Sequence, residues 1–168
     1  TAFPGTEQFA LVGEYMAKLE TLDGFGTNSP IFLRVEGGKP PLPSPDDTTT
    51  GQGPIFLVDV DAHSPERGRI IPVTTRYQAD ETTWQPEGLV AVTPVLGFPL
   101  RARTTYALVL STDFIQPVEG FSDVWNPDYT DHSYYTEIDE ALTALGVPRS
   151  RVAYAIRFTT QDPLSEMA

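Results

Sequence analysis

The sequence contains no cysteine among its 168 residues, so it can form no disulfide, no thiolate nucleophile and no cysteine-based zinc site. Positive charge is also scarce: 11 Lys and Arg residues stand against 23 Asp and Glu, which gives a net charge of -12. This balance argues against nucleic acid as a partner, because phosphate backbones require clustered Lys and Arg. No apolar run approaches the roughly 20 residues that span a bilayer, so we expect a soluble domain without membrane insertion.

The length suits a single domain with a sizeable core. The chain starts at Thr1 and contains neither the basic region nor the apolar region of a signal peptide. We therefore expect either an exported protein whose signal has been removed or a fragment, located outside the cell or on its surface.

Sixteen prolines and thirteen glycines fall mostly between short β-branched or aromatic runs, a pattern typical of strands and turns. The segment Gly37–Gly53 is rich in Pro, Gly, Asp and Thr, and we expect an exposed loop there. The recurrence of the runs favours an antiparallel β-sandwich. The predicted strands are Ile31–Val35, Ile55–Asp61, Ile70–Gln78, Leu89–Thr93, Thr104–Thr112 and Val152–Thr160.

Two short peripheral α-helices are predicted in addition. The first covers about residues 6–20, with Thr6 as its N-cap. The second covers about residues 136–146, where apolar residues recur at helical spacing before Gly146 and Pro148. The apolar stripe of the first helix consists of Phe9, Val12, Met16 and Leu19.

A leucine, a turn and a tyrosine six residues later open the run from Leu100 to Leu110. This arrangement resembles the tyrosine corner of Ig-like domains, in which the phenol packs beneath the turn and its hydroxyl bonds to upstream backbone. We therefore predict that Tyr106 is mostly buried and hydrogen-bonded to backbone near Leu100.

Further segments resemble bacterial Ig-like domains, and two of them resemble the N-terminal domain of bacterial extracellular (virulence-factor type) lipases. Those two are Leu22–Ile31, which contains Asp-Gly-Phe, and Ala155–Gln161, which contains Phe-Thr-Thr. The resemblance implies an Ig-like β-sandwich over residues 1–162, and residues 163–168 as a C-terminal tail or linker to an α/β-hydrolase domain. The other similar segments are Pro72–Tyr77, Leu89–Pro94 and Gly97–Leu100.

The sequence offers no catalytic, cofactor-binding or metal-binding residue that we can assign, and we expect a chain that is not an enzyme and needs no cofactor. Ser122 lies in Gly120–Val124, which lacks the second glycine of a nucleophile elbow, and we interpret this segment as a loop. His63 and His132 have polar, loop-like neighbours, and we interpret both as surface residues.

The acidic residues allow two weak hypotheses of cation binding. Asp59 and Asp61 alternate along a predicted strand, and we interpret them as solvated acids on one face. A looser calcium candidate is the run that contains Asn126 and the acids Asp123, Asp128 and Asp131. From Thr104 to Pro148 there is no Lys or Arg, so we expect a strongly negative surface.

Five aromatic residues could form a platform that stacks on sugar rings, although we favour core or loop packing for them. Two function hypotheses follow. The first is a non-catalytic accessory domain of an exported lipase- or esterase-like protein, which positions or presents a neighbouring α/β-hydrolase domain or another protein. The alternative is a free-standing cell-surface module that binds glycan or calcium. The five aromatic residues are Trp84, Trp125, Tyr129, Tyr134 and Tyr135.

Overall fold

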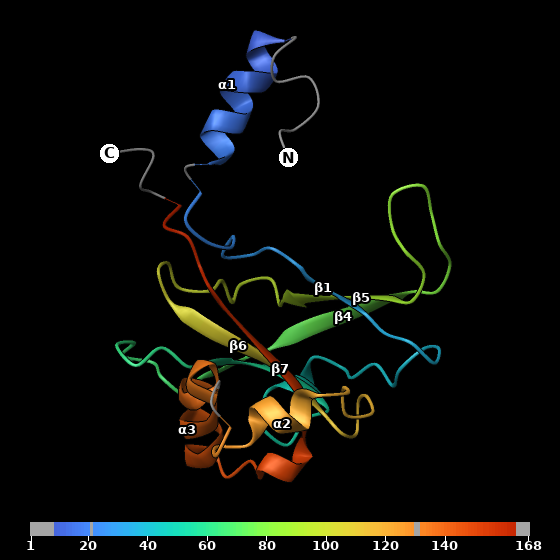
Figure 1. Cartoon of the computed structure of the whole chain (residues 1–168), viewed down its shortest axis with the longest axis vertical. Helices are drawn as coiled ribbons and strands as arrows, with labels where there is room; N and C mark the ends of the chain where they lie inside the picture. The colour runs from blue at the N-terminus through green and yellow to red at the C-terminus, as the bar shows by residue number, and fades with distance from the viewer. Residues whose placement is uncertain (1–8, 21, 130–131, 164–168) are drawn as a thin grey trace.

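The computed structural model describes residues 9–20, 22–129 and 132–163, and two antiparallel sheets form its centre (Figure 1). The three-stranded sheet has the order β1-β5-β4, and the four-stranded sheet has the order β3-β2-β6-β7. The prediction of a mainly β chain with antiparallel pairing is therefore confirmed. The strands are β1 (Ile31–Arg34), β2 (Ile55–Asp59), β3 (Ile70–Ile71), β4 (Val73–Gln78), β5 (Leu89–Pro94), β6 (Thr105–Ser111) and β7 (Val152–Thr159).

The predicted strand Ile70–Gln78 is divided at Pro72, and its two parts belong to different sheets. β3 pairs with β2, whereas β4 pairs with β5. Proline has no N–H to donate to a ladder, which makes it a natural point for a strand to leave one sheet and join another. Its carbonyl still accepts a hydrogen bond of 2.9 Å from the N–H of Val95.

A first apolar cluster lies between the two sheets. Leu57 and Leu108 reach it from the four-stranded sheet, and Val73, Val90 and Val92 reach it from the three-stranded sheet; all five are fully buried. Burial of this apolar surface between the sheets is the main source of their stability, at about 25 cal/mol per Å² of area removed from water.

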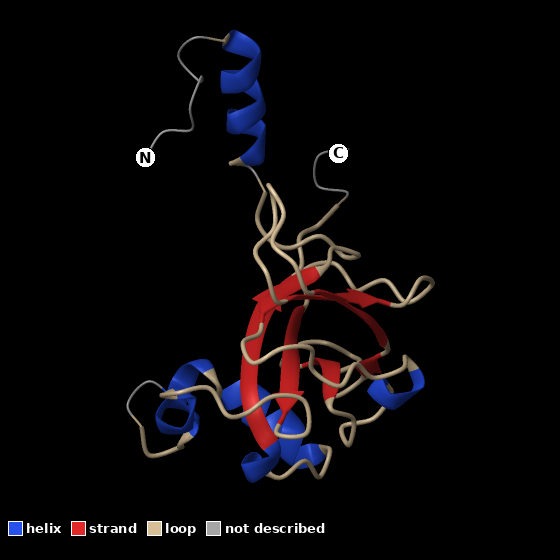
Figure 2. Cartoon of the chain, turned by 90° about the vertical axis from the view of Figure 1, so that its right-hand side faces the viewer, coloured by secondary structure: helices blue, strands red, loops and turns tan. Residues whose placement is uncertain are grey.

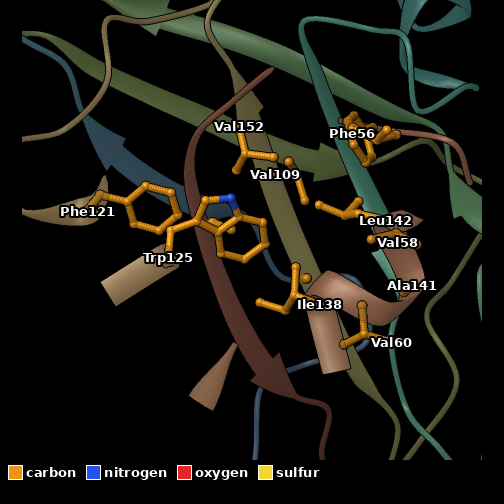
Figure 3. Packing of buried hydrophobic residues seen from close by; sticks show 13 residues of the cluster. Phe56, Val58, Val60, Val109, Phe121, Trp125, Ile138, Ala141, Leu142 and Val152 are labelled. Carbon is orange, nitrogen blue, oxygen red and sulfur yellow. The ribbon is translucent and has the colours of Figure 1, made fainter. Parts of the chain in front are cut away.

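A second apolar cluster covers the other face of the four-stranded sheet, where α2 (Phe121–Trp125) and α3 (Thr136–Ala144) pack (Figure 3). Phe56 and Val58 point from β2 into this cluster, so every residue of β2 is buried on one face or the other. The prediction of two peripheral helices is wrong in this respect: there are three α-helices in the described chain, and two of them complete a core. The 3-10 helices are η1 (Asp46–Thr48), η2 (His132–Tyr134) and η3 (Arg149–Arg151).

The helix predicted over about residues 6–20 is present as α1 (Ala10–Leu19), with Phe9 in the N-cap position. Thr6, the predicted N-cap, lies outside the described residues. α1 projects away from the two sheets (Figure 2), and none of its residues is buried. The second predicted helix is confirmed as α3, which ends before the positive-φ Gly146.

The segment Gly37–Gly53, predicted as an exposed loop, is partly buried. Thr48 is fully buried at the end of η1, and its hydroxyl accepts a hydrogen bond of 2.9 Å from the N–H of Val73. The same hydroxyl donates to the carbonyl of Pro45 at 2.7 Å. This side chain satisfies the backbone of β4 at its edge, so the segment is part of the body rather than a free loop.

Candidate functional site

Several long-range hydrogen bonds outside the sheets gather at the end of the body where the chain continues past β7. We call it the exit end and define it by segments 22–27, 96–104 and 158–162. The N–H of Phe25 donates to the carbonyl of Thr159 at 2.9 Å, and the N–H of Gln161 donates to the carbonyl of Phe25 at 2.8 Å. The rings of Phe25 and Phe158 meet edge to face at 5.4 Å. The chain that leads into β1 therefore runs beside the chain that follows β7.

Thr160 is the centre of the polar contacts at this end and is 1% exposed. Its N–H donates to the carbonyl of Thr104 at 3.0 Å, and its hydroxyl accepts a hydrogen bond of 3.0 Å from the N–H of Thr104. The hydroxyl also donates to the carbonyl of Arg101. Arg103 adds a backbone bond of 3.1 Å to the Thr160 carbonyl and an ion pair of 3.0 Å to Asp162.

Tyr106 supports the same turn from below, as the sequence predicted. The side chain is 1% exposed, and its hydroxyl accepts a hydrogen bond of 3.0 Å from the N–H of Arg101, the residue after Leu100. Burial raises the pKa of the Tyr106 phenol above its ordinary value of 10.0. The phenol therefore stays neutral and satisfies a backbone group that the turn would otherwise leave unpaired.

Gly24 permits the close approach of the two chain segments. A Cβ atom at this position would lie 2.6 Å from the backbone nitrogen of Gln161 and 2.7 Å from the carbonyl oxygen of Thr159. Neither backbone atom can move without breaking the pairing around Phe25. The glycine of the Asp-Gly-Phe segment thus has a steric role that the sequence alone did not show.

The prediction that Phe158–Thr160 ends a paired strand is confirmed. Phe158 and Thr159 pair with Tyr106 and Thr105 of β6. The tail or linker predicted for residues 163–168 lies outside the described residues from position 164 onward. Because Thr160 and Gln161 are also hydrogen-bonded to other segments, the chain is held in place as far as Gln161.

Apolar side chains remain exposed at the exit end. Leu22 is 50% exposed, Phe25 is 59% exposed and Phe98 is 43% exposed. The turn that carries Phe98 is joined to the segment before β1 by a bond of 3.0 Å from the N–H of Leu100 to the carbonyl of Thr27. The segments 22–27 and 96–104, which carry these side chains, therefore lie at the end of the body from which α1 projects (Figure 1).

The sequence candidates for nucleophilic chemistry have different surroundings in the structure. Gly120–Val124 was predicted as a loop, but Ser122 lies in the first turn of α2 and is exposed. His63 is exposed as predicted, with a side-chain exposure of 98%. The surface prediction for His132 is wrong: it is buried, its Nδ1 lies 3.3 Å from the carbonyl oxygen of Val124, and its ring packs against Trp125. The polar residues next to His132 in the sequence do not indicate this buried position.

Asp59 is not a solvated acid on a strand face, because it is 1% exposed on the side of β2 that faces Tyr106. Its carboxylate accepts hydrogen bonds from the Ser64 hydroxyl at 2.5 Å and from the N–H of Asp61 at 3.1 Å. Burial raises its pKa above the ordinary value of 3.8, and these hydrogen bonds offset only part of that rise. Asp61 lies beyond β2, where it accepts a bond of 3.1 Å from the N–H of Thr105.

In the calcium candidate formed by Asn126 and the nearby acids, Asn126 is used in a local turn. Its side-chain oxygen accepts a hydrogen bond of 3.1 Å from the N–H of Asp128. Asp123 lies in α2, and Asp131 lies outside the described residues. Over residues 9–20, 22–129 and 132–163, no three His, Asp or Glu side chains converge in a way that could hold a metal ion.

The five aromatic residues do not share one surface. Trp125 is 6% exposed and stacks on Phe121 (Figure 3). Tyr135 meets both rings edge to face. Burial raises the pKa of Tyr135 above its ordinary value. Trp84 lies in the loop between β4 and β5. This loop extends away from α2 (Figure 1). A hollow of about 420 Å³ reaches the edge of Trp125, but neither Tyr129 nor Tyr135 lines it.

The negative surface expected between Thr104 and Pro148 is partly neutralised by arginines from other segments. The distance from nitrogen to oxygen is 2.8 Å between Arg67 and Glu140, and 2.9 Å in the Arg151–Asp113 and Arg157–Glu137 pairs. Four of the seven acidic residues that the structure describes in this stretch are thereby paired. The ion pairs are Arg67–Glu140, Arg149–Asp139, Arg151–Asp113 and Arg157–Glu137.

Among the described residues, no helix has both the length and the apolar character needed to cross a membrane. A comparison of the chain with models of protein families, with curated proteins and with solved structures finds no match.

Proposed function

We propose that this chain is a non-catalytic Ig-like accessory domain of an exported bacterial lipase- or esterase-like protein, and that it sets the position of a neighbouring α/β-hydrolase domain. The partner would follow the chain beyond Pro163. The proposal combines the resemblance of Leu22–Ile31 and Ala155–Gln161 to the N-terminal domain of extracellular lipases with the geometry of the exit end.

The observation that supports it best is the bonding of the outgoing chain. Gln161 is paired with Phe25, Thr160 is bonded to the turn that ends at Thr104, and Asp162 is ion-paired with Arg103. A chain held by hydrogen bonds on both sides up to its last described residues leaves the body in a fixed direction. A fixed direction is what a domain needs in order to set the position of its neighbour, since a loose linker would let the two domains reorient.

Substitution of Gly24 in the protein expressed from the complete gene tests the positioning role. Gly24→Ala places a methyl group against backbone of the outgoing chain, whereas a Cβ at Gly26 meets only the side chain of Ser29, which can move. We expect Gly24→Ala to broaden the distribution of distances between the two domains in small-angle X-ray scattering, and Gly26→Ala to leave it unchanged. Equal scattering from both variants would contradict the positioning role.

Ester hydrolysis tests the assignment of chemistry to the neighbour. We expect the complete protein to hydrolyse p-nitrophenyl esters and the 168-residue chain to show no turnover. Turnover by the purified chain that disappears in Ser122→Ala would overturn the proposal, as would a complete gene that encodes no folded domain beyond Pro163.

A further inference from the structure

α1 is a helix that the rest of the described chain does not support. Leu11 is 77% exposed and Tyr15 is 65% exposed, and no residue of the helix is buried. At 10 residues it is shorter than the roughly 12 to 15 residues at which isolated helices become even marginally stable in water. A helix with this much apolar surface and so little length requires a covering surface to persist.

The location of α1 indicates what covers it. The segment after the helix pairs through Phe25 with Thr159 and Gln161, so the helix and the outgoing chain leave the body at the same end (Figures 1 and 2). Leu22, whose N–H donates to the carbonyl of Leu19 at 3.2 Å, and Phe98 add exposed apolar side chains at this end of the body. An apolar centre beside the Arg103–Asp162 ion pair has the composition of an interface with a polar rim.

We infer that α1, together with Leu22, Phe25 and Phe98, is the docking surface for the domain that follows Pro163, and that this domain presents an apolar groove to the helix. The inference rests on the proposed function, because it requires a following domain.

The size of the surface favours a tethered partner over a second copy of the chain. A helix of 10 residues is about 15 Å long. One face of so short a helix supplies only a small part of the roughly 1,200 Å² that a stable interface between separate molecules buries. A partner joined to the outgoing chain needs much less contact, since the link raises its effective concentration to about the millimolar range. The outgoing chain lies beside the segment that carries α1, so the link would be short.

Hydrogen exchange of the amides in 10–19 tests the inference directly. We expect rapid exchange in the 168-residue chain and exchange slower by at least about tenfold in the protein expressed from the complete gene. The double variant Leu11→Glu with Tyr15→Glu should remove this protection from the complete protein. The matched control is Trp84→Glu, which makes the same kind of change at a residue that is 91% exposed and lies away from the exit end; it should leave the protection intact.

Equally rapid exchange in both proteins would overturn the docking role of α1 while leaving the accessory function standing, provided that a folded domain follows. Protection that appears in the 168-residue chain and rises with its concentration would identify a second copy as the occupant and overturn the inference. A complete gene product without a folded domain after Pro163 would remove the proposed function as well.

Discussion

The helix-covered face of the four-stranded sheet and the exit end differ in how far their apolar side chains are buried. On the sheet face, α2 and α3 cover Phe56 and Val58, and the helix residue Ile138 is fully buried. At the exit end, Phe25 and Phe98 stay exposed. The backbone of Thr160 is hydrogen-bonded there to the turn that contains Arg103 and Thr104. The chain thus completes its own core on one side and holds a largely polar, ordered surface with uncovered apolar side chains on the other.

The largest expected effect comes from truncating the helix-covered face. Ile138→Ala should lower the free energy of unfolding by about 2 to 5 kcal/mol, because the lost methyl groups leave a cavity in a packed core. Phe98→Ala, at a side chain that is 43% exposed, should change it by no more than about 1 kcal/mol. Urea unfolding of both variants gives the comparison, and equal losses would show that the two regions do not differ as described.

The next effect concerns the polar part of the exit end. Tyr106→Phe removes the acceptor of the Arg101 N–H and should cost about 1 to 3 kcal/mol if that donor is left unsatisfied. Tyr15→Phe, at an exposed ring of α1, is the control and should leave the unfolding midpoint unchanged. A midpoint that does not move in Tyr106→Phe would mean that the hydroxyl does not stabilise the turn.

A smaller, pH-dependent effect is expected from Asp59. Burial raises its pKa above 3.8, so the unfolded chain loses this proton at a lower pH than the folded protein does. The ionised carboxylate therefore destabilises the fold progressively as the pH rises from 3.8 to the folded pKa. Asp59→Asn removes this penalty. The Tm of the variant minus the Tm of the wild type should therefore increase as the pH rises across that range.

Asp61 provides the control of opposite sign. Partial burial raises the pKa of Asp61, but hydrogen bonds from the N–H groups of His63 and Thr105 lower it by more than burial raises it. The net result is a pKa below 3.8. Its ionised form stabilises the fold above 3.8, and this contribution is lost as the pH falls through the folded pKa. Asp61→Asn should therefore be less stable than wild type at neutral pH. The same sign of the Tm difference for both variants would contradict the contrast in their surroundings.

The strands and α3 could be predicted because their residues follow a simple local periodicity. The burial and hydrogen bond of Tyr106 could also be predicted, since its spacing from Leu100 is typical of a tyrosine corner. α2 could not, because its five residues show no full helical repeat and depend on packing of Phe121 and Trp125 against β-strands distant in sequence.

The role of Gly24 depends on pairing between segments more than 130 residues apart. The role of Thr160 depends on contacts with residues 56 to 59 positions earlier in the chain. A single sequence reveals neither. Asp59 was misassigned for a related reason. Alternation along β2 predicts that one face is solvated, yet both of its faces are covered.

The central claim is that the outgoing chain is fixed to the exit end. Amide exchange of Gln161, followed by NMR in the 168-residue chain, tests it most directly because this N–H donates to the carbonyl of Phe25 at 2.8 Å. We predict exchange at least about a hundredfold slower than in an unstructured peptide, and a return toward the unstructured rate in Gly24→Ala. Exchange of the wild-type Gln161 amide at the unstructured rate would show that the chain leaves the body freely after β7, and it would contradict the account.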